Sequence, residues 1–141
     1  MRNADLVARK LTILGEHVAR LRRRRPVSAE AMLADVDLQD AISLSVLVVV
    51  QEATDIALHM ISDEGWGAAA SYREGFETLA AHRVIAPDLA RQLGGAVAVR
   101  NRIAHGYASV DFERLWAELP AAIDAFESFA QAIAAWVSKP A

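Results

Sequence analysis

Apolar side chains recur at intervals of three and four residues along most of the chain. The first such segment runs from Asp5 to Arg24. Pro26, two residues later, cannot continue a helix. The spacing of the apolar positions puts them on one face of an amphipathic helix. The pattern therefore predicts a helix over residues 5–24, with the inward positions Leu6, Val7, Leu11, Leu14, Val18 and Leu21.

A longer stripe predicts a second helix from about Leu38 to Ser62. The β-branched run Val46–Val50 favours a strand when it is taken alone. The helical stripe continues through this run, and the segment is too long for one strand. Ser28 and Asp37 are suitable N-caps, so a short turn over 29–34 is expected before the long helix. The stripe consists of Ile42, Val46, Val49, Ala53, Ile56, Ala57 and Met60.

The long helix is also apolar on its opposite side, at Leu44, Leu47 and Val48. A helix that is apolar on two sides lies at the centre of a bundle or contributes to contact with another chain.

The second half of the chain predicts three more helices. Glycines around Trp66 indicate a loop, after which a short helix is expected over 71–82. Pro87 suits the first turn of a helix over 87–104, and Gly106 is expected to end it. Asp111 is an N-cap candidate for a final helix over 112–137, which we expect to be divided or kinked at Pro120. The sum is one all-α domain spanning residues 1–141, an up-and-down bundle of four to five helices.

Composition agrees with a soluble helical bundle. Hydrophobic residues make up 54% of the 141 residues and aromatic residues only 6%, with no cysteine. The absence of cysteine excludes disulfide scaffolds, thiolate metal sites and cysteine nucleophiles. The chain begins with charged residues rather than the apolar run of a secretory signal, and no uninterrupted apolar stretch reaches the length of a membrane span. We therefore expect a cytoplasmic protein with no membrane partner.

Charge narrows the range of functions. The formal net charge is −3, which disfavours a protein that coats nucleic acid through bulk positive charge. The arginines are nevertheless clustered, with one run at 20–25 that also complements the C-terminal dipole of the first helix. This run is more consistent with a solvated helix end than with a dedicated RNA clamp.

Polar chemistry is concentrated in Arg-Asn-Arg-Ile-Ala-His-Gly-Tyr at residues 100–107. Arg100 offers a permanently charged fork that suits phosphate oxygens, and histidine is the side chain that exchanges a proton near neutral pH. This combination indicates a phosphate-handling site. The competing interpretation is an ordinary helix end with basic residues near the dipole and a glycine cap, and the spacing leaves both open.

Arg100 and His105 do not share a helix face. Five residues at about 100° each separate their directions by about 140° on an unbroken helix. A common site therefore requires the helix to finish before His105, or a second copy of the chain to complete a cleft.

A metal site at Asp55, His59 and His82 is a weaker alternative. Asp55 and His59 are four residues apart on one helix face, but two ligands do not make a site. A hydrogen-bonded pair is the commoner outcome. We expect no metal and no cofactor.

The residues at 100–107 resemble the R-x4-H-x-Y motif of HepT-like HEPN-domain proteins. Arg100, His105 and Tyr107 match the motif, and Asn101 stands directly after the arginine as in that family. Three further segments look like family segments in the same order: 53–57 (ATDIA), 72–79 (YREGFETL) and 110–116 (VDFERLW). The resemblance covers roughly residues 5–137.

The resemblance implies a homodimeric endoribonuclease toxin of a type VII toxin–antitoxin pair. It implies that Arg100 and His105 are the catalytic pair, cleaving RNA without a metal ion and leaving a 2′,3′-cyclic phosphate. It also implies a partner, a minimal nucleotidyltransferase antitoxin that adds AMP to Tyr107. Asn101 and Arg102 are expected to support the site or contact substrate, although Arg102 lies outside the motif and is equally consistent with a solvated charge.

Two other classes of function remain open. The net acidity makes RNA affinity modest, which favours a non-catalytic regulatory protein that binds a nucleotidyltransferase or a nucleotide. The second of these classes is a helical scaffold that neither cleaves RNA nor binds a nucleotidyltransferase or a nucleotide. The sequence does not identify the RNA target.

Overall fold

The computed structural model describes residues 4–140, which form helices and loops without a β-strand. The all-α prediction is confirmed, with the short turn after Ser28 forming a helix of its own. The elements in chain order are α1 (Ala4–Arg24), α2 (Ala29–Leu33), α3 (Val36–Glu64), α4 (Tyr72–Ala81), α5 (Pro87–His105), the 3₁₀ turn η1 (Tyr107–Ser109) and α6 (Phe112–Val137).

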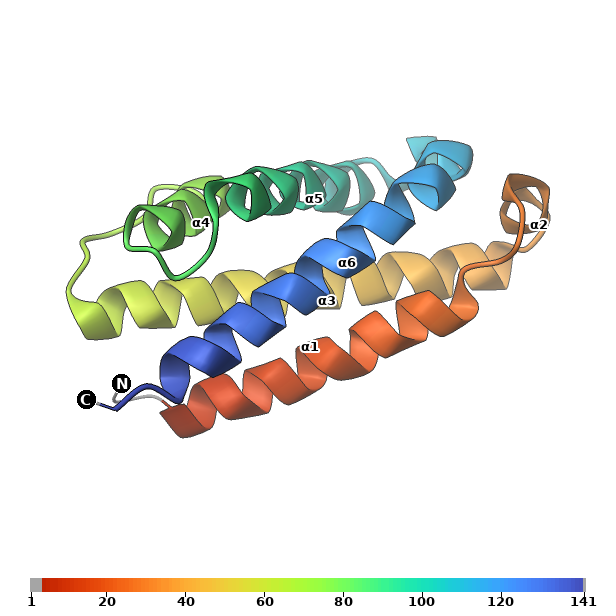
Figure 1. Cartoon of the computed structure of the whole chain (residues 1–141). Helices are drawn as coiled ribbons and strands as arrows, with labels where there is room; N and C mark the ends of the chain where they lie inside the picture. The colour runs from red at the N-terminus through yellow and green to blue at the C-terminus, as the bar shows by residue number, and fades with distance from the viewer. Residues whose placement is uncertain (1–3, 141) are drawn as a thin grey trace.

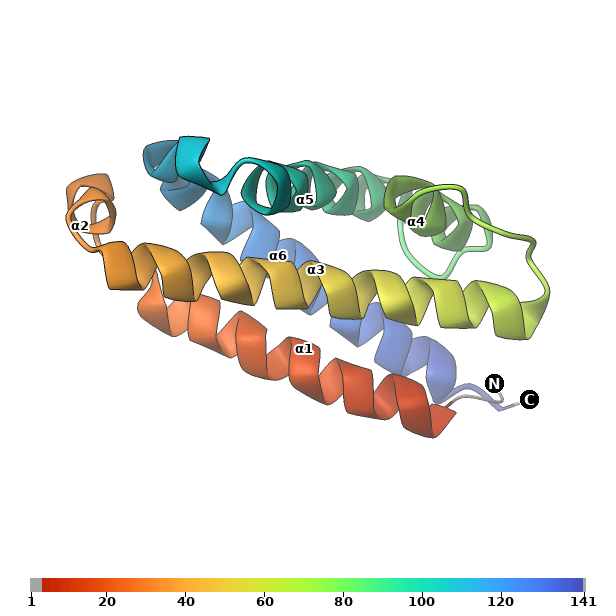
Figure 2. The same cartoon turned by 180° about the vertical axis from the view of Figure 1, so that it is seen from behind.

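Four long helices run alternately up and down (Figure 1). α1 packs against α3 and α6, and α5 packs against α3 and α6 on the other side of the bundle. α4 lies beside α5 and also contacts α3, while α2 packs against α6. The reverse view shows α3 running the full length of the bundle between α1 and α5, with the start of α1 and the end of α6 at the same end of the bundle (Figure 2).

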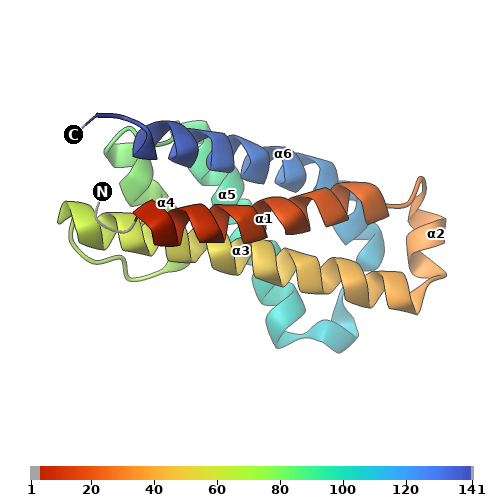
Figure 3. The same ribbon diagram turned by 90° about the horizontal axis from the view of Figure 1, so that it is seen from below.

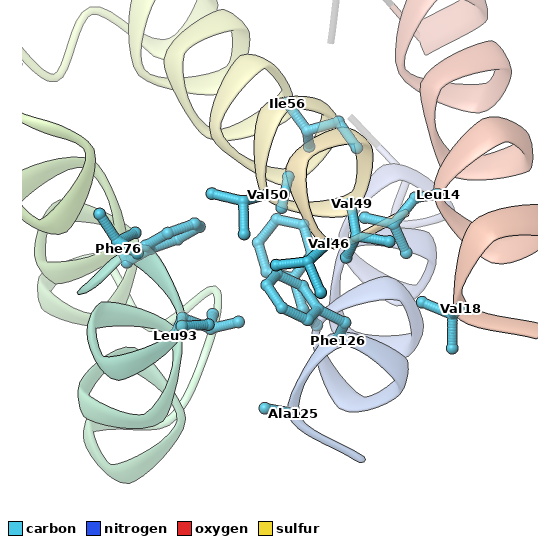
Figure 4. Close-up of a cluster of buried hydrophobic side chains, with 14 of the residues drawn as sticks. Leu14, Val18, Val46, Val49, Val50, Ile56, Phe76, Leu93, Ala125 and Phe126 are labelled. Atoms are coloured by element: carbon cyan, nitrogen blue, oxygen red, sulfur yellow. The ribbon is translucent and has the colours of Figure 1, made fainter. Parts of the chain in front are cut away.

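The core is built around α3. Its valines and isoleucines meet side chains from α1, α4, α5 and α6 in one buried cluster (Figure 4). Phe76 of α4 and Phe129 of α6 meet edge to face, with ring centroids 5.7 Å apart. By its length and composition α3 could also cross a membrane. This is weak evidence for a membrane span, because 56% of the apolar window of α3 is buried inside the bundle. This burial accounts for its apolar character.

Polar side chains begin most of the helices. The predicted caps Ser28 and Asp111 accept hydrogen bonds from the backbone N–H groups of Ala31 and Arg114. The prediction of Asp37 as the cap of the long helix was wrong, because Asp35 Oδ1 accepts the N–H of Leu38 at 3.0 Å and the helix starts at Val36. Asp35 and Asp37, two positions apart, are both of a residue type that is favoured at an N-cap. Only the path of the backbone decides which of them caps the helix.

α6 is continuous from Phe112 to Val137, so the expectation that Pro120 divides this helix was wrong. A proline in a helix leaves the carbonyl four residues earlier without its N–H donor. Here that carbonyl belongs to Trp116, and Arg25 Nε donates to it at 3.0 Å. The Arg25 guanidinium also lies 4.1 Å above the Trp116 ring, whose Nε1 donates to Pro26 O at 2.8 Å. One arginine of the basic run thus supports α6 at its proline.

Candidate functional site

The site is built on the last turn of α5. The helix runs through His105 and ends at Gly106, whose N–H donates to Arg102 O at 3.1 Å. Gly106 was predicted to end the helix, and it does so with φ −154°, an extended conformation rather than a left-handed cap. Because the helix is unbroken, the first route to a single-chain site, in which it finishes before His105, was wrong.

Arg100 is half-buried and carries no compensating charge. Its Nη1 donates to Asn101 Oδ1 at 3.2 Å, and its guanidinium carbon lies 5.7 Å from the centre of the Tyr72 ring of α4. Between residues 4 and 140 no carboxylate forms an ion pair with it. Most of its five donors therefore remain available to an anion.

His105 is exposed and forms no hydrogen bond with any described residue. Both ring nitrogens are therefore accessible to a ligand. Asn101 stands four residues earlier, so it shares a helix face with His105. Asn101 also accepts a hydrogen bond from the Arg100 guanidinium.

Arg102 points elsewhere. Its Nη2 donates to Glu118 Oε1 of α6 at 2.7 Å, and Arg114 lies 3.4 Å from the same carboxylate oxygen. This ion pair joins α5 to α6. The structure therefore separates Arg102 from Arg100 and Asn101, which were grouped with it by sequence.

Tyr107 begins η1, the segment that projects from the bundle between α5 and α6 (Figure 3). Its hydroxyl donates to Asp40 Oδ1 of α3, and its ring meets Phe112 edge to face at 5.9 Å. Burial and then the Asp40 carboxylate raise the pKa of Tyr107, against an opposing effect of the neighbouring Ser43 hydroxyl. Burial and the Asp40 carboxylate both disfavour the negatively charged phenolate form of Tyr107.

Two grooves flank this end of α5. The first, between α4 and α5 beside Arg100, is lined by Ser71, Tyr72, Arg73, Val97, Ala98 and Asn101. The second, between α3 and α5, is lined by Asp40, Ser43, Leu44, Leu47, Ile103, Ala104 and Tyr107. Tyr72 and Asn101, the two contacts of Arg100, line the first groove, and Tyr107 lines the second.

Sequence reasoning missed Tyr72 and Asp40 as neighbours of the motif. Asp40 is an acidic residue that interrupts the apolar face continuing to Leu44 and Leu47. This interruption was the sequence signal that could have marked Asp40 as a functional residue. Tyr72 offered no comparable signal, because an aromatic residue at the start of a helix is ordinary.

Two of the three residues considered for a metal site, Asp55 and His82, have other partners. Lys10 Nζ donates to Asp55 Oδ2 at 3.1 Å, and Gln51 donates to the other carboxylate oxygen at 2.9 Å. His82 stacks on Trp66, with ring centroids 4.0 Å apart. No group of three or more histidine or acidic side chains arranged for a metal ion occurs in the described part of the chain.

Comparison with known proteins agrees with the fold and with the family resemblance. Residues 14–133 match the family described as HepT-like, Ribonuclease HepT-like. The chain is 22% identical over 128 residues to the tRNA nuclease HepT of Aphanizomenon flos-aquae, covering 91% of this chain and 87% of that protein.

Solved structures share the fold. A TM-score of 0.85 relates the chain to the tri-AMPylated HEPN toxin of Shewanella oneidensis, solved in complex with an MNT antitoxin. The two are 24% identical over 93% of this chain and 98% of that one. YutE of Bacillus subtilis, a cytosolic protein of unknown function, gives a TM-score of 0.80 at 16% identity, covering 94% of this chain and 88% of its own.

Proposed function

Because the chain belongs to the HepT-like ribonuclease family, we propose that it is an endoribonuclease toxin of a toxin–antitoxin pair. The observation that carries this proposal is the state of the motif side chains. Arg100 has no ion-pair partner and His105 no hydrogen bond within residues 4–140, and both lie at the accessible end of α5. A cation without an ion-pair partner and a proton-transfer group without a hydrogen bond to the described residues fit a phosphodiester substrate better than a structural role.

The division of labour follows from the chemistry of RNA. His105 removes the proton of the ribose 2′-hydroxyl, or protonates the leaving 5′-oxygen, while Arg100 neutralises charge that develops on phosphorus. The 2′-oxygen forms a bond to phosphorus as the bond to the 5′-oxygen breaks, which leaves a 2′,3′-cyclic phosphate. The nucleophile is part of the substrate, so the scheme needs no metal ion. DNA lacks the 2′-hydroxyl and is not cleaved.

A homodimer would complete the site. Arg100 and His105 diverge by about 140° on a continuous helix, so one substrate contacts both more easily in a cleft between two copies. An apolar strip along α3 supports such a contact, because Val36 is 66% exposed and Leu44 is 58% exposed. Leu44 and Leu47 border the Tyr107 groove, so this strip is continuous with the motif.

The proposed regulation is AMP addition to Tyr107 by a minimal nucleotidyltransferase antitoxin. Tyr107 is 39% exposed, so an enzyme can reach its side chain. Modification would add negative charge and bulk near Arg100 and His105 and would repel RNA. It would also remove the proton that Tyr107 donates to Asp40, and so loosen η1 from α3.

The first test is RNA cleavage in EDTA by the purified chain. His105→Ala is expected to lower the cleavage rate by roughly 10²- to 10⁴-fold, the usual contribution of a general acid or base. Arg100→Ala is expected to lower it by roughly 10²- to 10³-fold. Product ends are identified by mass spectrometry.

Matched controls are available in the same chain. Arg91→Ala removes an exposed arginine from the far end of α5, and His82→Ala removes an exposed histidine outside the motif. Both should cleave at the wild-type rate. Undiminished cleavage by the Arg100 and His105 variants would contradict the proposal, whereas modification of Tyr107 without any cleavage would support a regulatory protein instead.

A further inference from the structure

The hydroxyl that is proposed to accept AMP is already bound to a base. We propose that Asp40 is a catalytic residue of this chain for its own modification: it takes the proton of Tyr107 when the hydroxyl attacks the α-phosphorus of a nucleoside triphosphate. This inference rests on the proposed role of Tyr107 as acceptor. It assigns part of the transfer chemistry to the modified protein rather than to the transferase.

The geometry suits proton transfer. Asp40 stands in the second turn of α3, and its Oδ1 accepts the Tyr107 hydroxyl directly. The edge contact with Phe112 limits movement of the Tyr107 ring, so the hydroxyl is held against the carboxylate. A general base must lie within hydrogen-bond reach of the proton that it removes, and Asp40 does so before any partner binds.

Asp40 is free to act as a base. It is exposed, and none of the cations described between residues 4 and 140 forms an ion pair with it. A carboxylate paired with lysine or arginine would be a weaker proton acceptor. Its solvent access also lets it pass the proton to water after each transfer.

The groove contains a second polar group without an assigned task. Ser43 is only 3% exposed, and its hydroxyl forms no hydrogen bond with the described residues. It lines the same groove as Asp40 and Tyr107. Its effect on Tyr107 favours the ionised phenol, opposite to that of Asp40. The Ser43 hydroxyl can therefore donate to the Tyr107 oxygen as that oxygen loses its proton.

A base is needed because the phenol does not ionise spontaneously. Burial and the adjacent carboxylate raise the pKa of Tyr107 above its ordinary value of 10.0, so phenolate is scarce at neutral pH. The hydroxyl must then attack in its neutral form, and its proton must leave as the new bond forms. Asp40 is the described acceptor at that oxygen.

The step balances as follows. The Tyr107 oxygen forms a bond to the α-phosphorus, and the bond from that phosphorus to the bridging oxygen breaks. Pyrophosphate leaves with the electron pair of that bond. The phenolic proton moves to Asp40 Oδ1 and from there to solvent. The nucleoside triphosphate, with its magnesium ion, is supplied by the nucleotidyltransferase.

The test compares modification rates of the full-length wild-type chain and Asp40→Asn. Asparagine keeps an oxygen that accepts the Tyr107 hydrogen bond, but it is a far weaker base. Each protein is incubated with ATP, magnesium and minimal nucleotidyltransferases, starting with the MNT antitoxin of the Shewanella oneidensis complex. AMP incorporation is followed by intact-protein mass spectrometry across a range of pH. Asp37→Asn removes an exposed carboxylate from the first turn of α3 and is the matched control.

Asp40→Asn is expected to lower the rate of AMP addition by roughly 10²-fold or more, while Asp37→Asn stays at the wild-type rate. The pH profile of AMP addition should differ between the two proteins, because the side-chain amide of the variant cannot take up the phenolic proton as the Asp40 carboxylate does. RNA cleavage by unmodified Asp40→Asn should equal that of wild type, which shows that the site remains folded.

Three outcomes would overturn the inference, and they are distinguishable. Equal AMP addition to wild type and Asp40→Asn would overturn the role of Asp40 alone. Loss of both RNA cleavage and AMP addition in Asp40→Asn would mean that Asp40 is structural. Failure of the wild-type chain to be modified by any transferase would overturn the acceptor role of Tyr107 and this inference together, without affecting RNA cleavage.

Discussion

At the level of single residues, the surroundings of each side chain at the end of α5 decide its role. Arg100 and Arg102 are two positions apart, yet Arg102 is neutralised by Glu118 and Arg100 has only an amide oxygen and an aromatic ring as neighbours. Residues two apart on a helix point in different directions, so two arginines of one sequence motif reach different environments. Spacing predicted a basic cluster, but it did not predict which cation stays unpaired.

Tyr107 offers a direct test of its contact with Asp40. In a spectrophotometric titration of tyrosinate, Tyr107 should ionise above its ordinary pKa of 10.0, because burial and Asp40 both favour the neutral phenol. The folded-state pKa is raised, so the contribution of Tyr107 to stability is complete below about pH 10 and is lost as pH rises through the folded-state pKa. Thermal unfolding between neutral pH and pH 11 follows this loss.

Two variants assign the titration step. Tyr107→Phe should remove the late ionisation. Asp40→Asn should move it to lower pH, because the amide carries no charge. A late step that persists unchanged in Asp40→Asn would contradict the contact.

At the level of elements, the site depends on where α5 ends and on how α6 begins. η1 turns the chain immediately after Gly106, with Ser109 N–H donating to Gly106 O at 2.9 Å, and Asp111 then starts α6. The two ends of this short connection are fixed by the Arg102–Glu118 ion pair and by the Tyr107 contact with α3. His105 is therefore held at an exposed corner between anchored segments.

The start of α6 is supported by Arg25, and this support is measurable. Arg25→Ala should lower the free energy of unfolding by about 1–3 kcal/mol, because the Trp116 carbonyl then loses its donor at the proline. In a Pro120→Ala background the helix supplies its own N–H to that carbonyl, so the same change should cost less. Chemical denaturation of the four proteins gives the coupling energy, expected at about 0.5–3 kcal/mol. A coupling of zero would mean that Arg25 acts only through the Trp116 ring.

At the level of the whole molecule, the bundle buries one side of α3 and leaves another side apolar and exposed. Val36 and Leu44 lie on the exposed side, in the half of α3 that carries Asp40. An exposed apolar surface of this kind, here interrupted by the exposed Asp40, typically marks an interface. Its continuity with the Tyr107 groove connects assembly with the proposed site.

Leu44→Glu tests that connection. An unpaired carboxylate in an apolar contact costs about 3 kcal/mol or more, so dimer affinity should fall by roughly 100-fold or more. RNA cleavage should decline in parallel if the site is completed by two copies. Light scattering coupled to size-exclusion chromatography measures the assembly.

Val27→Glu is the matched control, because Val27 is 98% exposed in the connection between α1 and α2 and packs against nothing. It should leave mass and activity unchanged. A monomeric wild-type chain that cleaves RNA at full rate would contradict the dimeric site.

The sequence by itself determined the helices, because the three- and four-residue periodicity of apolar side chains is a local property that burial then satisfies. From the apolar surplus of α3 it limited this helix to a central position or a contact with another chain, and it determined the motif at 100–107 from residue type and order. Local rules failed at Asp37 and Pro120, where two acidic residues compete for one cap and a distant arginine replaces a lost donor.

Only the tertiary structure decided which side chains meet. Asp40 and Tyr107 are separated by 67 positions, Arg25 and Trp116 by 91, and Arg102 and Glu118 by 16. Such contacts depend on how helices pack, and periodicity fixes the buried face of each helix without fixing its neighbour. The motif could therefore be read from the chain, whereas its base, its unpaired cation and its anchors required the fold.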